Sequence, residues 1–210
     1  DYLNWFVKSF PCKHYLVTFL DHGGGLDEMS LDDDPDTPGK RWLSGKVLGE
    51  SLRAFAQTLA GKWELLFLQQ CGRGSLENLY SFRGTAKFIM SSPMKLVLPN
   101  GYYTAFHHWL GESPDEDGAA IAAKIAQFDD HYTMYTCLRT RALDELPGRF
   151  NLMLVPYLGR DHLDPPWELQ GVYTANGESL FDAESYLVRL AKLNQVDSPM
   201  LDSLFSWVNQ

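Results

Sequence analysis

Three short runs of β-prone apolar residues constrain the fold of this chain more than any other feature of its sequence. They span residues 15–20 (YLVTFL), 63–70 (WELLFLQQ) and 86–90 (AKFIM). Near-continuous apolar runs of this length are typical of strands buried on both faces, as in a parallel sheet covered by helices. Segments with helical periodicity separate the runs. The order strand, helix, strand, helix, strand therefore predicts a parallel α/β sheet.

Start and stop signals bound the segments between the strands. A helix is expected to start at Ser44, and Ser75 is the expected N-cap of the next one. Gly61 and Gly84 are expected to end these two helices. Residues 26–43 are rich in Asp, Pro and Gly, which predicts a polar loop. A strand or extended segment is expected at 132–138. Further helices are expected at 1–10, 102–110, 118–128, 142–158 (despite its proline), 183–193 and 199–208.

Charge and length exclude several classes of partner. The 210 residues carry a net charge of −9, which argues against a nucleic-acid or anionic-membrane partner because both require a positive field. The apolar runs are too short to span a membrane. The chain begins with Asp1, with no initiator methionine or signal peptide. We expect a soluble piece of a longer protein, and a cytoplasmic and a secreted location both stay open.

The chain contains three cysteines, Cys12, Cys71 and Cys137, and this odd number leaves at least one thiol free. No CxxC spacing indicates a metal site. We expect Cys12 and Cys137 to be inert. Cys71 differs from them because it directly follows a predicted strand.

Ligands of parallel sheets bind beyond the carboxyl ends of the strands. If the predicted strands are neighbours, the residues at their ends converge on one crevice. A histidine beside a cysteine can hold it as thiolate or take its proton, which gives a nucleophile for acyl transfer. The three strand ends carry His22-Gly23, Cys71-Gly72 and Ser91-Ser92.

The surroundings of Cys71 favour this chemistry. A helix is expected to begin a few residues later, and its N-terminal partial positive charge favours a thiolate. The backbone N–H groups of Gly23 and Cys71 are the candidates for an oxyanion hole, worth a few kcal/mol in such sites. The alternative is that Cys71 is a small buried hydrophobe and His22 an ordinary loop residue. Their placement at consecutive strand ends favours the functional interpretation.

Two blocks resemble those of the caspase-like cysteine peptidases. YLVTFLDHGGG is similar to their strand-plus-His-Gly block, and FLQQCGRGSLE to their strand-plus-Cys block. Within this group the clostripain family is the most similar. Its cysteine block reads Asp-x-Cys-x-x-Gly-Ser-aliphatic-Glu, and the matching residues here are Cys71, Gly74, Ser75, Leu76 and Glu77.

The resemblance implies a caspase-like three-layer sandwich with a mainly parallel sheet. Residues 1–130 would form its catalytic core, and residues 131–210 the C-terminal part of the same domain. His22 would be the general base or acid and Cys71 the nucleophile of a bacterial, regulatory or processing cysteine endopeptidase. It would hydrolyse protein or peptide substrates through a thioester acyl-enzyme. An inactive caspase-like binding module and a different α/β hydrolase acting on small esters or amides are the alternatives.

Two departures from the family pattern affect these expectations. Gln69 stands where the family has the Asp of its primary specificity pocket, so we expect a neutral or mixed pocket lined by Gln69, Ser91 and Ser92. The alternative for Gln69 is an amide that bonds local backbone. The family's sheet also begins with two strands that this sequence lacks. We therefore expect an upstream polypeptide segment or chain to complete the sheet, because the strand before His22 would otherwise be an unpaired edge.

A dense acidic loop follows the His-Gly block. Alternating carboxylates can bind calcium, on which relatives of this family can depend, but the EF-hand glycine and distal glutamate are not at the required spacing. A solvated surface loop is the favoured interpretation, and we expect no metal or other cofactor. The acidic residues are Asp32, Asp33, Asp34 and Asp36.

Overall fold

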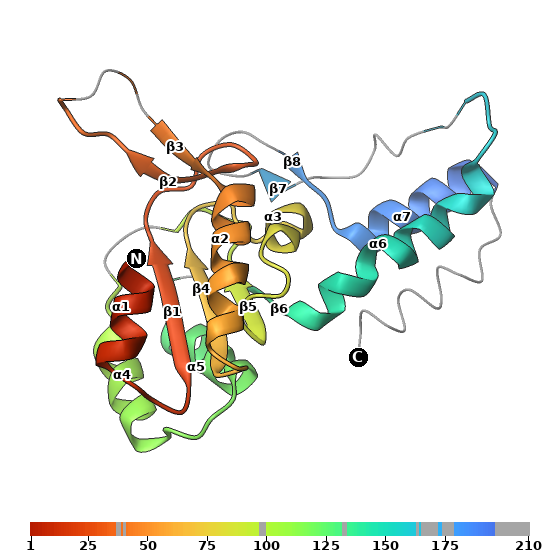
Figure 1. Cartoon of the computed structure of the whole chain (residues 1–210). Helices are drawn as coiled ribbons and strands as arrows, with labels where there is room; N and C mark the ends of the chain where they lie inside the picture. Colours follow the sequence, from red (N-terminus) through yellow and green to blue (C-terminus); the bar gives the residue numbers. More distant parts are fainter. Residues whose placement is uncertain are drawn as a thin grey trace.

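The computed structural model describes residues 1–36, 39, 41–96, 100–131, 134–162, 164, 172–173 and 179–195. Its centre is a four-stranded sheet in the order β1 (Tyr15–Leu20), β4 (Trp63–Gln69), β5 (Phe88–Ser91) and β6 (Thr136–Arg139) (Figure 1). β1, β4 and β5 run parallel, and β6 is antiparallel to β5. The predicted α/β fold with a mainly parallel sheet is confirmed.

Helices cover both faces of the sheet and make three layers. Alternate residues of β4 divide between two cores, because successive side chains of a strand point to opposite faces. Leu66 and Leu68 pack with α2 (Gly45–Thr58) and α3 (Leu76–Ser81). Leu65 and Phe67 pack with α4 (Tyr103–Glu112) and α5 (Gly118–Phe128). Every residue of β4 is buried, which explains its near-continuous apolar sequence.

The expected helix starts are confirmed. Ser44 and Ser75 are the N-caps of α2 and α3, and each hydroxyl accepts a hydrogen bond from a backbone N–H three residues later. α1 (Tyr2–Ser9), α4, α5 and α7 (Ala183–Leu193) lie where helical periodicity predicts them. α6 (Thr140–Leu154) contains Pro147 and continues into the short helix η1 (Val155–Tyr157). The helix expected at 199–208 lies outside the described residues.

The polar loop expected at 26–43 is the main error in the predicted secondary structure. Its ends form an antiparallel hairpin of β2 (Glu28–Asp32) and β3 (Arg41–Ser44), apart from the main sheet (Figure 1). The hairpin is anchored by Met29, which is fully buried. The alternation of Met29 and Leu31 with polar residues over 28–32 is a signal for a strand, but it is short and lies in a segment rich in Asp, Pro and Gly.

The two remaining strands, β7 (Val172–Tyr173) and β8 (Ser179–Leu180), form a separate antiparallel pair. In the main sheet β1 and β6 are the two edges among the described residues. None of the helices in the described ranges is long and apolar enough to cross a membrane.

Candidate active site

The register of the sheet places the His-Gly and Cys-Gly turns side by side. β1 and β4 are adjacent and parallel, and their last paired residues are Leu20 and Gln69. His22 and Cys71 each follow these residues by two positions. The turns are in direct contact, because a Cβ added to Gly23 would lie only 2.1 Å from the carbonyl oxygen of Cys71. Only glycine fits at that position.

The His22 turn is held by its backbone, while its side chain is exposed. The His22 N–H donates to the Asp21 carboxylate at 2.6 Å, and the His22 carbonyl accepts from the Ser30 N–H at 3.0 Å. Ser30 belongs to β2, so the unforeseen hairpin supports the turn. Among the described residues, no hydrogen bond joins the His22 imidazole to the Cys71 thiol.

Cys71 is half-buried, and its thiol donates a hydrogen bond to the Leu96 carbonyl at 3.2 Å. The segment Ser92–Leu96 lies along the cysteine turn. The N–H groups of Gly74 and Gly72 donate to the carbonyls of Ser92 and Met94 at 2.9 and 3.1 Å. These contacts hold residues 92–96 against the cysteine turn through both its backbone and its side chain.

Gln69 is buried in a neutral hydrogen-bond network on the α4 side of the sheet. Its amide nitrogen donates to Asn100 Oδ1 at 2.7 Å and to the Tyr102 hydroxyl at 3.2 Å, and its amide oxygen accepts from the Tyr103 hydroxyl. Burial raises the pKa of both tyrosines, which keeps their hydroxyls uncharged. The amide of Gln69 therefore bonds side chains of the neighbouring helix region and not local backbone.

The two serines at the end of β5 are fully buried, and their hydroxyls donate to backbone carbonyls of neighbouring segments. Ser91 is paired with Leu68 and donates to the Leu68 carbonyl at 2.7 Å, so its side chain lies on the opposite face of the sheet from Gln69. Ser92 donates to the Met134 carbonyl at 2.8 Å. In this arrangement Ser91 and Gln69 do not line one pocket.

Arg73 is the important residue that sequence reasoning missed. It is completely buried, although arginine is rarely buried without partners. Its guanidinium bridges the cysteine turn and the histidine turn. The only signal in the sequence is an arginine between two glycines directly after a predicted strand end. The acceptors are the carbonyls of Gly24, Gly25, Leu26 and Cys71 and the Asn78 side chain.

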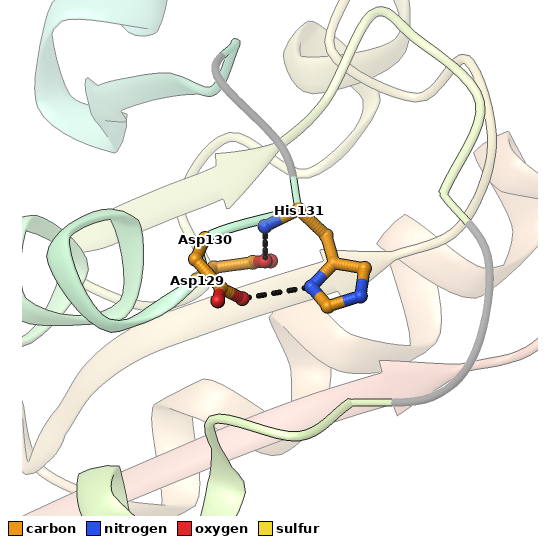
Figure 2. A group of neighbouring side chains, drawn as sticks. All are labelled: Asp129, Asp130 and His131. Atoms are coloured by element: carbon orange, nitrogen blue, oxygen red, sulfur yellow. Dashed lines mark hydrogen bonds and ion pairs between the residues drawn. The ribbon is translucent and has the colours of Figure 1, made fainter.

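Two acidic groups have the composition of metal ligands. In the loop after β2, Asp32 and Asp34 accept hydrogen bonds from backbone N–H groups two residues later, an arrangement of local turns. Asp129, Asp130 and His131 offer ligand atoms within 4.8 Å of one another (Figure 2). However, the Asp129 carboxylate already accepts from the His131 N–H and the Tyr135 hydroxyl. Neither group has an orphaned buried atom that would point to a cation.

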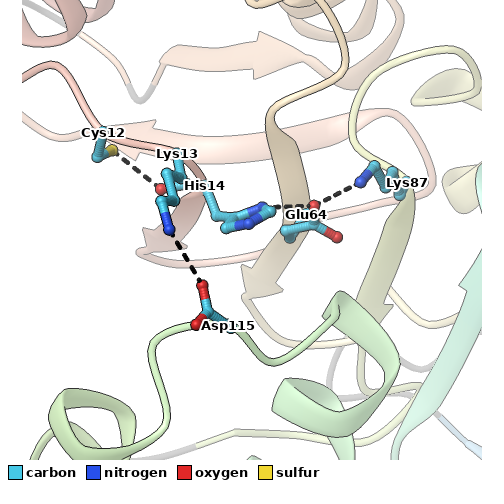
Figure 3. Close-up of polar contacts among 6 residues, drawn as sticks. All are labelled: Cys12, Lys13, His14, Glu64, Lys87 and Asp115. Atoms are coloured by element: carbon cyan, nitrogen blue, oxygen red, sulfur yellow. Dashed lines mark hydrogen bonds and ion pairs between the residues drawn. The ribbon is translucent and has the colours of Figure 1, made fainter.

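A third polar cluster lies at the other end of the sheet, where β4 begins. The buried Glu64 carboxylate accepts from Lys87 at 2.5 Å and from His14 at 2.8 Å (Figure 3). Burial pushes the pKa of Glu64 upward, but the hydrogen bonds from Lys87 and His14 outweigh it and leave the pKa lowered. This cluster ties together the starts of three neighbouring strands, and it is remote from His22 and Cys71.

The comparisons with known proteins concern the fold of the chain. No protein-family model and no curated protein matches the chain. Solved structures of C11, or clostripain-like, cysteine proteases match it at 16–20% sequence identity, a level at which the likeness establishes the fold.

Three of these structures illustrate the match. The inactive zymogen of a C11 protease from Parabacteroides distasonis is 20% identical with a TM-score of 0.61, and the match covers 98% of this chain and 56% of that one. A secreted C11 cysteine protease from Bacteroides thetaiotaomicron, iotapain, is 16% identical with a TM-score of 0.64, covering 99% and 60%. A clostripain from the same bacterium, in complex with a peptide inhibitor, is 18% identical with a TM-score of 0.57, covering 89% and 75%. The chain thus spans less than two thirds of the first two proteases.

Proposed function

We propose that this chain is the His- and Cys-bearing part of a bacterial cysteine endopeptidase, with His22 and Cys71 as its catalytic dyad. The observation that carries the proposal is the contact between the two turns, where Gly23 packs directly on the Cys71 carbonyl. The imidazole and the thiol belong to turns that follow the carboxyl ends of two adjacent parallel strands, at the same end of the sheet. The likeness in fold to C11 proteases, two of them in complex with peptide inhibitors, supports a peptide substrate.

The reaction follows from the chemistry of these two side chains. The Cys71 thiol gives its proton to the His22 imidazole, and the sulfur attacks the carbonyl carbon of the scissile peptide bond. The C–N bond then breaks as the imidazolium returns the proton to the leaving amine. A water molecule, deprotonated by His22, splits the resulting thioester and restores the thiol. The backbone N–H groups of Gly23 and Cys71 are the proposed donors to the oxyanion.

Two parts of the proposal concern the substrate and the partner. Gln69 and its hydrogen-bond partners are uncharged, while the buried Asp129 carboxylate contributes to the raised pKa of Tyr102 and Tyr103. We therefore propose a neutral or mixed pocket on the acyl side of the cut, in which a buried guanidinium lacks the carboxylate that the family has at the position of Gln69. We also propose that an upstream polypeptide segment or chain pairs with the free edge of β1, as the family's additional strands would require.

Selective labelling of Cys71 tests the dyad. Cys12 is also free and exposed, so it serves as the internal control. Burial raises the pKa of the Cys137 thiol to about 11, so this thiol labels slowly for its own reason and is not a control. A peptidyl electrophile should modify Cys71 at least about 10²-fold faster than Cys12, because general-base assistance by a histidine contributes about this much. The His22→Ala variant should lose the advantage, and the Cys71→Ala variant should lose peptide hydrolysis. Equal labelling of Cys71 and Cys12 would contradict the proposal.

One observation favours a second candidate, a caspase-like module that binds peptides without cutting them. The Cys71 thiol donates its hydrogen bond to the Leu96 carbonyl and not to the His22 imidazole. A module of this kind would bind peptides with equal affinity before and after Cys71→Ala, and neither form would release cleaved product. Detection of cleavage products by mass spectrometry separates the two candidates.

A further inference from the structure

From the bonding of its guanidinium we infer that Arg73 is a positioning residue that sets the distance between the His22 turn and the Cys71 turn. This inference rests on the proposed function and adds to the dyad a third residue that does not touch the substrate. The hydrogen bonds of Arg73 to the two turns go to their backbone carbonyls.

The guanidinium bonds both turns at the same time. Its Nε donates to the Cys71 carbonyl at 3.1 Å, and therefore to the backbone of the proposed nucleophile itself. Nη2 donates to the Gly24 carbonyl at 2.7 Å, and Nη1 donates to the Gly25 and Leu26 carbonyls at 2.8 and 3.1 Å. Gly24 follows His22 by two residues. One rigid, planar group thus fixes three carbonyls after the histidine and the carbonyl of the cysteine in a single geometry.

The strands alone do not supply this precision. β1 ends at Leu20 and β4 ends at Gln69, so both proposed catalytic residues lie beyond the last paired residues of the sheet. Turns outside a sheet are held by whatever hydrogen bonds their backbone groups find. Arg73 supplies hydrogen-bond donors to these turns, beyond the last backbone pairs of β1 and β4.

The local chain is shaped so that Arg73 can reach back. Gly72 has a φ of +70°, a conformation that L-residues with side chains rarely adopt, and it reverses the chain between Cys71 and Arg73. The Asn78 side chain, in the first turn of α3, accepts from Nη1 and donates to the Gly72 carbonyl at 3.3 Å. Asn78 therefore steadies both the guanidinium and the turn that carries it.

Lysine is the informative replacement because it keeps the charge and the approximate length while it loses the planar fork. The ammonium of a lysine at this position has three donors on one nitrogen, and it cannot bond the Cys71 carbonyl and the three carbonyls of the His22 turn in the same geometry. We expect Arg73→Lys to lower kcat/KM by about 10²-fold through kcat, because a displacement of about 1 Å at a reacting pair costs this much.

The matched control is Arg53, which uses the same chemistry elsewhere. Its guanidinium donates to the Arg83 carbonyl at 2.9 Å and to the Ser81 carbonyl at 3.2 Å, between α2 and the end of α3. Arg53→Lys should change the denaturation midpoint but not kcat/KM per labelled active site. An equal loss of kcat/KM in both variants would show that Arg73 has only a structural role.

A double-mutant cycle between Arg73 and His22 gives a second test, because the coupling between them in the labelling rate of Cys71 would be absent if Arg73 had only a structural role. In the otherwise unchanged protein, His22→Ala should slow the labelling of Cys71 and flatten its pH profile. In the Arg73→Lys background, His22→Ala should have little further effect, because the imidazole is already out of reach of the sulfur. If the two changes multiply independently, the inference is wrong.

The remaining outcomes are also decisive. Should Arg73→Lys fail to fold, Asn78→Ala takes its place, since it keeps Arg73 and removes its side-chain partner, together with the hydrogen bonds from Asn78 to Gly72 and Ser75. Unchanged kcat/KM in that variant overturns the inference. If the unmodified protein shows no selective labelling of Cys71 at all, the proposed function has failed rather than the role of Arg73. If it labels and cleaves normally while Arg73→Lys does the same, the role of Arg73 has failed alone.

Discussion

The contact between Gly23 and Cys71 allows a sharp test by a single methyl group. In a Gly23→Ala variant, the new Cβ would lie 2.1 Å from the Cys71 carbonyl oxygen, 3.1 Å from its carbonyl carbon and 3.2 Å from Arg73 Nε. The oxygen belongs to the backbone, so it cannot rotate away. Since an ordinary contact between carbon and oxygen needs roughly 3 Å or more, the two turns must separate by about 1 Å.

A separation of this size predicts the magnitude of the loss. A displacement of about 1 Å between reacting groups costs about 10²-fold in rate, or roughly 3 kcal/mol of transition-state stabilisation. Gly23→Ala should therefore lower kcat/KM for a peptide substrate, and the rate of Cys71 labelling by a peptidyl electrophile, by about two orders of magnitude. Both are measured on protein whose folding has been confirmed by circular dichroism.

Gly49→Ala is the matched control, because its Cβ would lie 2.0 Å from the Ser81 carbonyl oxygen, in the contact between α2 and α3. The steric overlap is the same, but the dyad is not involved. We expect Gly49→Ala to destabilise the protein by about 1–3 kcal/mol, as overpacking does, and to leave kcat/KM per labelled site unchanged. Our reasoning is refuted if Gly23→Ala retains full activity, or if both variants lose activity equally.

Three further predictions concern the scaffold. The pKa of Glu64 is lowered in the folded protein, so its stabilising contribution is complete above the ordinary pKa of about 4.3 and is lost as the pH falls through the folded value. The urea midpoints of Glu64→Gln and of the unmodified protein should therefore converge in acid. Leu66→Ala removes a fully buried side chain and should cost about 2–5 kcal/mol in the same assay, whereas Val47→Ala, at a side chain that is 53% exposed, should stay within about 0.5 kcal/mol. Burial raises the pKa of Tyr102, so its tyrosinate absorbance, identified by difference from Tyr102→Phe, should appear only above the ordinary pKa of about 10, and the stability that depends on its neutral form should fall as the pH rises through that value.

The features that the sequence predicts correctly depend on short-range patterns. Periodicity and capping act within a few residues, and they predict the apolar run that forms β4, the helix start at Ser44, the N-cap Ser75 and the positions of α4, α5 and α7. The placement of His22 and Cys71 at consecutive strand ends is also readable in one dimension, because strands that alternate with helices lie parallel.

The tertiary structure decided which groups meet. The faces of β5 separate Ser91 from Gln69, because the register with β4 pairs Ser91 with Leu68. The hairpin of β2 and β3, anchored by the buried Met29, escaped prediction because its strand signal is short and lies in a segment rich in Asp, Pro and Gly. The Leu96 carbonyl at the Cys71 thiol is likewise a contact between residues distant in sequence.

Arg73 shows most clearly the difference between what the sequence predicts and what the tertiary structure decides. By composition it is a charged residue in a glycine-rich turn, and such residues are usually solvated. Its burial is possible only because the carbonyls of the histidine turn, 47–49 residues earlier in the chain, converge on its guanidinium. The sequence by itself determined that His22 and Cys71 follow the ends of two strands. Only the folded chain decided what holds the two turns together, because hydrogen bonds between distant turns leave no periodic trace in the sequence.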